Sequence, residues 1–304
     1  MKHRNLIPVV RYRVLYGGQG VTLCDWTCIP SQSGPGPEEA TDRHAIVFVR
    51  TGIFRKHQGT ECVVADAGTV LFFKRDQGYA VSHPSCSGDR CSVVTVSDEF
   101  VDEMRAALQI RNPRGRAEFF GTAHGHVGSV VMLAVRDAAI AAEAGDDLET
   151  GARLLGLVSA ALRLQWRPSP SRNRLSQSLQ NQVVSKVKEI ASTRFKERLS
   201  LRVFSDETGY SPYHLLRVFR EATGFPIHRY LNRLRLLHAL ERFDAPTGLS
   251  HLAFDLGFCS HSHFTSAFRA EFGVTPVSLR VRWNSERVKN LRNHLRSALL
   301  ERSH

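Results

Sequence analysis

The chain has 304 residues, of which 42% are hydrophobic and 23% charged, and a formal net charge of +12 at pH 7. This composition suits two globular domains, each long enough to bury a core. No apolar run approaches the roughly 20 residues that a membrane-spanning helix needs, and the first residues lack the apolar region of a signal peptide. The six cysteines are too sparse for a disulfide scaffold, so we expect a cytoplasmic protein without a membrane partner.

The positive charge is concentrated in the C-terminal part. Residues 1–171 contain 19 Lys and Arg against 18 Asp and Glu, whereas residues 172–304 contain 22 against 11. A basic half is typical of a protein that binds a polyanion such as nucleic acid. Charge asymmetry alone leaves a simple solvated surface as the alternative.

Residues 1–97 have the pattern of short strands separated by turns. Hydrophobic and polar residues alternate in Val9–Leu15, His44–Arg50 and Arg90–Val96. Further short strands are predicted at Gly52–Phe54, Glu61–Val64 and Thr69–Phe73. Many short strands with regular turns predict an antiparallel barrel or sandwich. A small barrel either fills with side chains or holds one small ligand.

Cysteine and histidine residues in this half are candidates for a thiolate or zinc site. The candidates are Cys24, Cys28, Cys62, His83, Cys86 and Cys91. Their spacing matches no standard pair of ligands, and cysteine is commonly a small core residue. His124 and His126 lie in a glycine-rich segment that favours a solvated loop, and no predicted strand carries the His-x-His and Glu set of a metal-binding cupin. We therefore expect no metal site, no cofactor and no catalytic residue, which argues against an enzyme.

The pattern becomes helical after residue 97. Asp98–Ile110 predicts a short helix capped by Ser97, and Val127–Ala144 and Leu148–Trp166 predict two antiparallel helices with broad apolar faces. These faces either form a dimer interface or pack on the barrel, and the sequence leaves both open. Prolines and serines in Arg167–Arg172 break the helical pattern and predict a linker.

A repeated pattern appears in the C-terminal part. Phe204-Ser205 stands five residues before Gly209-Tyr210, and Leu252-Ala253 stands five residues before Gly257-Phe258, an offset of 48. Beyond each turn the offset is 49, and the matched pairs are Leu215 with Phe264, Phe219 with Phe268, Arg220 with Arg269, and Gly224 with Gly273. A registered repeat with a single inserted residue indicates two copies of one structural unit.

Each copy has the residue types of two helices joined by a tight turn. Gly209 and Gly257 permit the left-handed backbone of such a turn, and Ser211 and Ser260 are suited to cap the helix that follows. A helix, a glycine-containing turn and a capped helix form the pattern of a helix-turn-helix, whose second helix enters the major groove of DNA. Two such units predict a DNA-binding protein.

Apolar residues at helical spacing assign one face of each second helix to the core. They are Leu215, Val218, Phe219 and Ala222 in the first copy, and Phe264, Ala267, Phe268 and Phe272 in the second. The opposite faces are predicted to be exposed, and they carry Tyr213, Leu216, Arg217 and Arg220 in the first copy and His261, Ser262, Thr265, Ser266 and Arg269 in the second. Between the copies, Pro226–Phe243 predicts one stiff helix with Arg233 and Arg235 on its outside. Such a connector fixes the separation of the two recognition helices, and successive major grooves on one face of DNA are about 34 Å apart.

Residues from about 185 to 281 resemble the DNA-binding domain of AraC/XylS-type bacterial transcription regulators. The matching segments are Gly209–Arg220, Thr223–Pro226, Tyr230–Arg235, Gly257–Arg269 and Phe272–Pro276. The N-terminal half is more loosely similar to the cupin-like effector and dimerisation domain of that family. The resemblance covers nearly the whole chain.

The resemblance implies which side chains read bases. By position they are Tyr213, Leu216, Arg217, His261, Ser262, Thr265 and Ser266. Two of them depart from the family pattern, because Leu216 stands where a polar reader is usual and Ser266 where an Arg often stands. Arg217 is able to bond a guanine with two hydrogen bonds, so we expect more specificity from the first copy. Phosphate contacts are expected from Arg220, Arg269, Arg233 and Arg235.

Taken together, these patterns predict an α+β protein of two domains. We expect a cupin-like antiparallel β-barrel with effector-sensing and dimerisation roles at 1–166, a linker at 167–177, an all-α tandem helix-turn-helix domain at 178–281 and a basic helix at 282–304. The function is then a transcription regulator, an activator, that binds double-stranded promoter DNA as a homodimer and responds to a small-molecule effector. The resemblance implies activation through RNA polymerase. Three alternatives stay open: a barrel enzyme or a cysteine-based methyl or redox sensor fused to a DNA-binding domain, and a non-specific architectural DNA binder.

Overall fold

The structure is a computed structural model, which describes residues 9–18, 20–30, 34–84, 88–109, 120, 122–165 and 174–287. Its strands are β1 (Val9–Gly18), β2 (Val21–Ile29), β3 (His44–Gln58), β4 (Glu61–Asp66), β5 (Thr69–Phe73), β6 (Ala80–Ser82), β7 (Asp89–Val96) and β8 (His124–His126). Its helices are α1 (Asp98–Ala107), α2 (Ser129–Glu143), α3 (Asp147–Gln165), α4 (Arg174–Arg194), α5 (Leu201–Thr208), α6 (Pro212–Thr223), α7 (Ile227–Leu240), α8 (Leu249–Asp255) and α9 (His261–Phe272).

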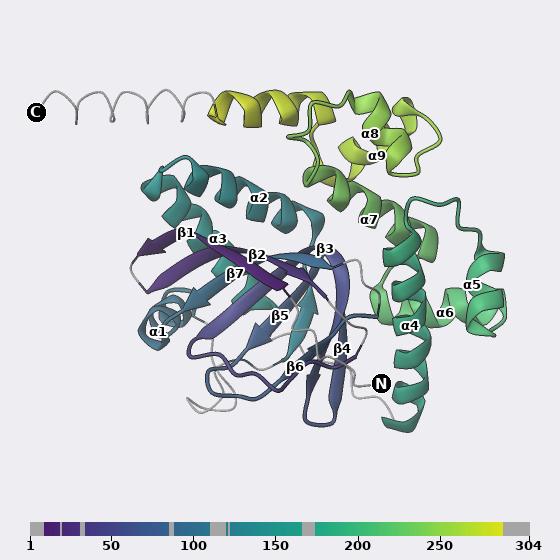
Figure 1. The fold of residues 1–304 in the computed structure, drawn as a ribbon, viewed down its shortest axis with the longest axis horizontal. Coiled ribbons are helices and arrows are strands. Elements are labelled where there is room, and N and C mark those ends of the chain that lie inside the picture. Colours follow the sequence, from purple (N-terminus) through teal and green to yellow (C-terminus); the bar gives the residue numbers. More distant parts are fainter. Residues whose placement is uncertain are drawn as a thin grey trace, which may run out of the picture.

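The N-terminal region is an antiparallel sheet, as predicted, but the described strands do not close into a barrel. The strand order is β1-β2-β7-β3-β5-β8, and β4 and β6 pair with β3 outside this path. The physical reason lies in β3, which changes partners near Gly52: residues before it pair with β5 and β7, and residues after it pair with β4 and β6. The second half of β3 therefore carries β4 and β6 away from the main sheet and leaves β1 and β8 as separate edges (Figure 1).

The strands β2, β6 and β8 were not predicted, and β2 and β8 show why. The patterns in the sequence do not mark β2, whose residues include Asp25 and Trp26, yet it pairs along most of its length with both β1 and β7. The expected loop around His124 and His126 is wrong, because these residues form β8 and pair with β5. In both cases pairing with a neighbouring strand overrides a weak local pattern.

Strand alternation gives the sheet two different apolar faces. Ile46 and Phe48 in β3 belong to a core that continues through α2 and α3 into the C-terminal helices. Ala45, Val47 and Val49 point to the other side and form a smaller core with β4 and β5. The sheet therefore separates a helix-covered face from a face that lines a pocket.

The helices lie close to their predicted positions. Ser97 caps α1 by accepting a hydrogen bond from the backbone N–H of Phe100. α4 begins at Arg174, inside the predicted linker 167–177, while residues 166–173 lie outside the described part of the chain. The predicted basic helix at 282–304 is described only to residue 287, as part of a helix at 276–287, and its remaining residues lie outside the described part of the chain.

Figure 1 shows α2 between the sheet and the C-terminal helices. It packs against β1 and β3 on one side and against α3, α7 and α9 on the others. The N-terminal and C-terminal regions therefore share a packed boundary. In the described residues, no helix has the length and apolar composition that a bilayer crossing requires.

Candidate nucleic-acid interface

The first helix-turn-helix is built from α5 and α6. Gly209 ends α5 with φ +74°, in the left-handed region that favours glycine. Ser211 then caps α6 by accepting a hydrogen bond from the backbone N–H of His214, and Pro212 occupies the first helical turn. The predicted turn and cap are both confirmed.

The second unit, formed by α8 and α9, repeats this construction. Gly257 has φ +85°, and a Cβ added there would lie 2.6 Å from the carbonyl oxygen of Lys196. Glycine is thus required both for the turn and for the close approach of the backbone at Lys196. Ser260 caps α9 by accepting from the backbone N–H of His263, and α9 ends at Gly273 with φ +76°.

The predicted inner faces of the two recognition helices are buried, except that Ala267 is only partly buried and Ala222 is exposed. Leu215, Val218 and Phe219 in α6 are at most 1% exposed, and the matching aromatic residues of α9 are also buried. Ala222 was expected in the core, but it lies exposed in the last turn of α6. Burial of one face fixes which face of each helix remains for DNA.

The outward face of α6 carries two arginines and one large aromatic ring. Tyr213 is 78% exposed, and Arg217 and Arg220 are exposed as well. Neither arginine has a side-chain hydrogen bond or ion pair with another described residue. Leu216 is 38% exposed beside them. The predicted exposure of all four is confirmed, whereas their contact with DNA stays a prediction.

The outward face of α9 contains a contact between two of its own side chains. Ser262, Ser266 and Arg269 are exposed, but His261 and Thr265 are only partly exposed. The Nε2 atom of His261 lies 3.4 Å from Oγ1 of Thr265, so these two groups already interact with each other. The expected difference in specificity between the two copies stays a prediction.

Arg233 and Arg235 are not on an outer surface, which corrects the prediction that they contact phosphates. Arg233 is 8% exposed, and it donates to Oγ of Ser129 (2.9 Å) and to the carbonyl oxygen of Val127. Arg235 is 7% exposed, and it donates to the carbonyl oxygens of Phe195 (2.7 Å) and Glu197 (2.8 Å). The prediction that Arg233 and Arg235 are exposed was wrong because other elements cover both sides of α7. The residue pattern within one helix does not reveal such neighbours.

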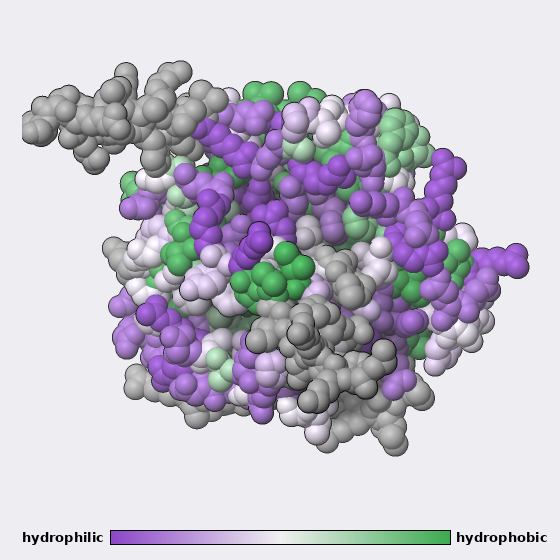
Figure 2. Space-filling model, in the orientation of Figure 1, coloured by the Kyte–Doolittle hydropathy of each residue, from purple (hydrophilic) through white to green (hydrophobic). Residues whose placement is uncertain are grey.

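The space-filling view shows the surface that surrounds these elements (Figure 2). Hydrophilic residues cover most of the face over the C-terminal helices, and hydrophobic surface is restricted to small patches. Figure 1 places α7 between the α5–α6 unit and the α8–α9 unit, as expected for a connector that sets their separation.

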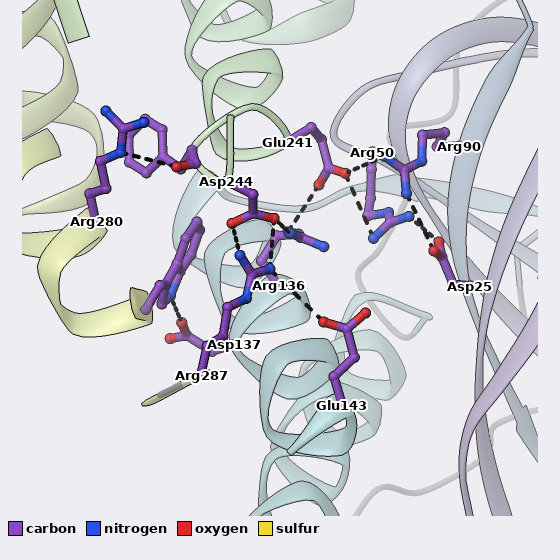
Figure 3. Close-up of polar contacts among 12 residues, drawn as sticks. Asp25, Arg50, Arg90, Arg136, Asp137, Glu143, Glu241, Asp244, Arg280 and Arg287 are labelled. Carbon is purple, nitrogen blue, oxygen red and sulfur yellow. Dashed lines mark hydrogen bonds and ion pairs between the residues drawn. The ribbon is translucent and has the colours of Figure 1, made fainter. Parts of the chain in front are cut away.

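Sequence reasoning missed a group of charged residues between the two regions (Figure 3). Glu241, at the end of α7, lies between Arg50 of β3 and Arg136 of α2, with ion pairs of 3.7 and 3.3 Å. Arg90 of β7 lies 3.8 Å from the same carboxylate. Asp25 of β2 pairs with both Arg50 and Arg90. No local motif marks these residues, because they come from five separate parts of the chain: β2, β3, β7, α2 and the end of α7.

The last described helix, residues 276–287, also contacts the N-terminal region. Trp283 is fully buried and donates from Nε1 to Oδ1 of Asp137 at 2.7 Å. Arg282 donates to both oxygens of the same carboxylate, and Arg287 pairs with Asp244 and Glu143. These basic residues are therefore engaged within the protein, so the described part of the basic tail packs on the protein itself.

The cysteine thiols bear on the alternative of a cysteine-based repair function. Burial raises the pKa of Cys24 and Cys62, and it raises the pKa of Cys91 well above its ordinary value. Because the thiolate is the nucleophilic form, raised pKa values disfavour a methyl-accepting role for these three side chains.

Known proteins share the C-terminal pattern. A family model described as "Helix-turn-helix domain" matches residues 204–282. The chain is 28% identical over 257 residues to the HTH-type transcriptional activator RhaS of Escherichia fergusonii, covering 81% of this chain and 88% of RhaS. It is 31% identical over 102 residues to the regulatory protein SoxS of Salmonella typhimurium, covering 33% of this chain and 95% of SoxS.

The chain is also similar to a bifunctional regulator and to a protein of solved structure. The bifunctional transcriptional activator and DNA repair enzyme AdaA of Bacillus subtilis is 27% identical over 126 residues, covering 40% of this chain and 58% of AdaA. A solved structure of ToxT from Vibrio cholerae aligns with 86% of this chain and 98% of ToxT, at 11% identity and a TM-score of 0.34. The sequence matches, together with the capped tandem helix-turn-helix, show that the chain belongs to the AraC/XylS family of DNA-binding transcription regulators.

Proposed function

We propose that this regulator activates transcription from promoter DNA under the control of a small-molecule signal bound in its N-terminal region. The observation that carries the proposal is a pocket of about 640 Å³ on the sheet face that the helices leave free. Its lining combines apolar residues such as Trp26 and Phe54 with acidic groups such as Glu39 and Asp89. A concave, mostly apolar space with a few polar groups is the usual form of a ligand site.

Strand alternation connects this pocket with the boundary to the DNA-binding helices. In β7, Asp89 and Cys91 line the pocket, and Arg90 between them projects to the other face, where it meets Glu241. In β2, Trp26 lines the pocket and Asp25 projects toward Arg50 and Arg90. A ligand that shifts β2 or β7 would therefore also move the charged residues that contact Glu241 at the end of α7.

The charged boundary is suited to a change of arrangement. The Nε atoms of Arg50 and Arg136 and Oε2 of Glu241 have no hydrogen-bond partner among the described residues. Buried charged groups with incomplete hydrogen bonding are costly, so an alternative arrangement that solvates them competes more easily. The signal would act by binding one arrangement better than the other, which is a population shift.

The proposed DNA contacts follow from exposure on α6 and α9. Base contacts are assigned to Tyr213, Leu216, Arg217, His261, Ser262, Thr265 and Ser266, and phosphate contacts to Arg220 and Arg269. We propose that activation occurs through contact with RNA polymerase, and we assign this contact to no particular residue. The alternative of a non-specific architectural binder would show strong salt dependence and little preference between sequences.

We also propose that the protein is a homodimer and that α3 supplies the interface. Leu148 is 87% and Leu155 is 44% exposed, and their spacing of seven residues places them on one face of the helix. Ala152 is exposed between them. α2 is a poor candidate, because both of its sides are packed within the protein. Leu155→Glu should convert a dimer to monomers in analytical ultracentrifugation, and an unchanged mass would exclude α3.

The sensing proposal is tested by filling the pocket. Val81 is partly exposed and lines it, so Val81→Trp would occupy part of the volume. We expect its affinity for mapped promoter sites, or its activation of them, to change about fivefold or more. Val14→Trp is the matched control, because Val14 is exposed on β1 outside the pocket. Equal behaviour of the two variants and the original protein would remove the pocket from the mechanism.

A further inference from the structure

We propose that Cys28, His83 and Asp89 form a binding site for a thiophilic divalent metal ion of the Zn²⁺ class. This reverses the expectation, drawn from sequence spacing, that the N-terminal region has no metal site. The proposal deepens the proposed function by naming the class of signal that enters the pocket. The control of DNA binding by the metal ion rests on the proposed sensing function. The binding of the metal ion itself does not depend on that function.

The sheet brings the three residues together from separate elements. Cys28 and Asp89 are directly paired in the β2–β7 ladder, so their side chains lie on the same face. His83 follows β6, which reaches the site because it pairs with the second half of β3. No spacing in the sequence predicts this set, since the three residues are brought together only by the pairing of strands.

Backbone packing around the site requires glycine at two positions. Gly88 has φ +70°, and a Cβ there would lie 2.4 Å from the carbonyl oxygen of Cys28. Gly52 has φ +84°, and a Cβ there would lie 2.2 Å from the carbonyl oxygen of Gly88. The strands that carry Cys28 and Asp89 are thus held at close approach, which gives the site a fixed frame.

The distances suit coordination. One sulfur, one nitrogen and one oxygen atom of the three side chains lie within 4.8 Å of one another. Nε2 of His83 is 2.7 Å from Oδ1 of Asp89. Zinc bonds of about 2.0–2.3 Å in a tetrahedron separate ligand atoms by roughly 3.3–3.8 Å, so shifts of about 1 Å would admit the ion.

The donor set selects the kind of ion. A thiolate and an imidazole favour Zn²⁺ and similar transition metals, whereas Mg²⁺ and Ca²⁺ prefer oxygen atoms alone. His83 and Asp89 are largely buried, and Cys28 is partly buried. Three protein ligands with one open position are typical of zinc sites that also bind a further molecule. All three residues line the pocket, so the open position would face it.

Cys91 is the candidate for the fourth ligand when no other molecule binds. It lines the same pocket and donates from Sγ to Oδ2 of Asp89 at 3.3 Å. A nucleophilic role for Cys28 is the rival interpretation. A carboxylate oxygen of Asp89 lies within 4.8 Å of the Cys28 sulfur, and negative charge beside a thiol disfavours the free thiolate that a nucleophile needs. A bound cation reverses that preference.

The experiment uses the full-length protein and Co²⁺ as a probe, followed by competition with Zn²⁺. We expect one Co²⁺ per chain, the visible spectrum of a tetrahedral ion and a thiolate-to-metal charge-transfer band that Zn²⁺ abolishes. Cys28→Ser should weaken the charge-transfer band and the binding of Co²⁺, with any remaining band coming from Cys91, and His83→Gln and Asp89→Asn should weaken binding about 100-fold or more. Cys62→Ser is the matched control, because Cys62 is exposed and lies outside the cluster.

Two results would overturn the site: no charge-transfer band in the original protein, or equal Co²⁺ affinity in Cys28→Ser and Cys62→Ser. Circular dichroism and binding to DNA check that each variant is folded. A second measurement compares affinity for promoter DNA with and without Zn²⁺. Metal binding with unchanged DNA affinity would overturn the regulatory role of the ion, while the Val81→Trp experiment would still decide whether the pocket senses another ligand.

Discussion

Glu241 lies 3.7 Å from Arg50, so the residue that follows α7 is paired with a strand of the N-terminal sheet. The two residues are 191 positions apart in the sequence, and both side chains are almost fully buried. A buried pair between two regions links the position of the DNA-binding helices to the sheet. Its strength is therefore relevant to stability and to regulation.

Replacing Glu241 with Gln should reduce the free energy of unfolding by about 1–3 kcal/mol, which is less than a fully isolated buried pair would lose. The loss is limited because Asp25 still pairs with Arg50 and Asp244 still pairs with Arg136. Urea unfolding measures the change. Glu207→Gln, which breaks an exposed pair with Arg194, is the control and should cost below about 1 kcal/mol. Similar losses for both variants would contradict a structural role for Glu241.

Arg217→Ala should weaken binding to the best promoter site by about 1–3 kcal/mol and relax the preference at one base position. Arg217 projects from the early part of α6, where a recognition helix reaches base edges. Selection of binding sites from a random DNA pool measures both effects. Arg202→Ala, an exposed change on α5, should leave the preference intact. A loss that is equal on all sequences would place Arg217 on a phosphate instead.

Replacing Arg235 should affect protein stability, whereas replacing Arg269 should affect DNA binding. Arg235→Ala leaves the buried carbonyl group of Phe195 and the partly buried carbonyl group of Glu197 without their donor, so it should cost about 2–4 kcal/mol of stability. Arg269→Ala should change stability by less than about 0.5 kcal/mol, because this side chain is exposed. It should instead reduce the slope of log K against log salt by about 1. Urea unfolding measures the structural role of Arg235, and salt titrations of DNA binding measure the phosphate contact of Arg269. A reduced salt slope in folded Arg235→Ala would show that Arg235 contacts phosphate after all.

His238 should make the protein less stable in mild acid. Burial, together with Lys196 and Arg242, lowers its pKa to about 4, and its ring stacks on Phe195 with centroids 4.0 Å apart. Between pH 6.5 and pH 4 the unfolded chain therefore binds a proton that the folded chain does not. The free energy of unfolding should therefore decrease as the pH is lowered through this window. His238 contributes up to about 1.4 kcal/mol per pH unit to this decrease.

The pH effect is measured by urea unfolding at a series of pH values. His238→Leu should have a smaller slope between pH 6.5 and pH 4, because its side chain takes up no proton in either state. His228→Leu, at an exposed position of α7, should keep the original slope. Identical slopes in both variants would show that His238 is protonated in the folded protein.

Much of the C-terminal region was predictable because its signals are local. The turn at Gly209 and the caps at Ser211 and Ser260 depend on conformations that few residue types adopt. The outward position of Arg217 follows from the spacing of Leu215, Val218 and Phe219 on the opposite face. Such features involve residues within one or two helical turns, so a single sequence contains them completely.

Other features depended on contacts between distant segments. The sequence could not place Arg233 and Arg235, because the surfaces that cover α7 come from α2 and from residues 195–197. It could not identify β2, and it could not join Cys28 to His83 and Asp89, because strand pairing brings those residues together. By itself the sequence determined the tandem helix-turn-helix and its outward faces, since helix periodicity and capping are local. The tertiary structure alone decided the open sheet, its pocket and the charged boundary at Glu241, since these arise from long-range pairing and burial.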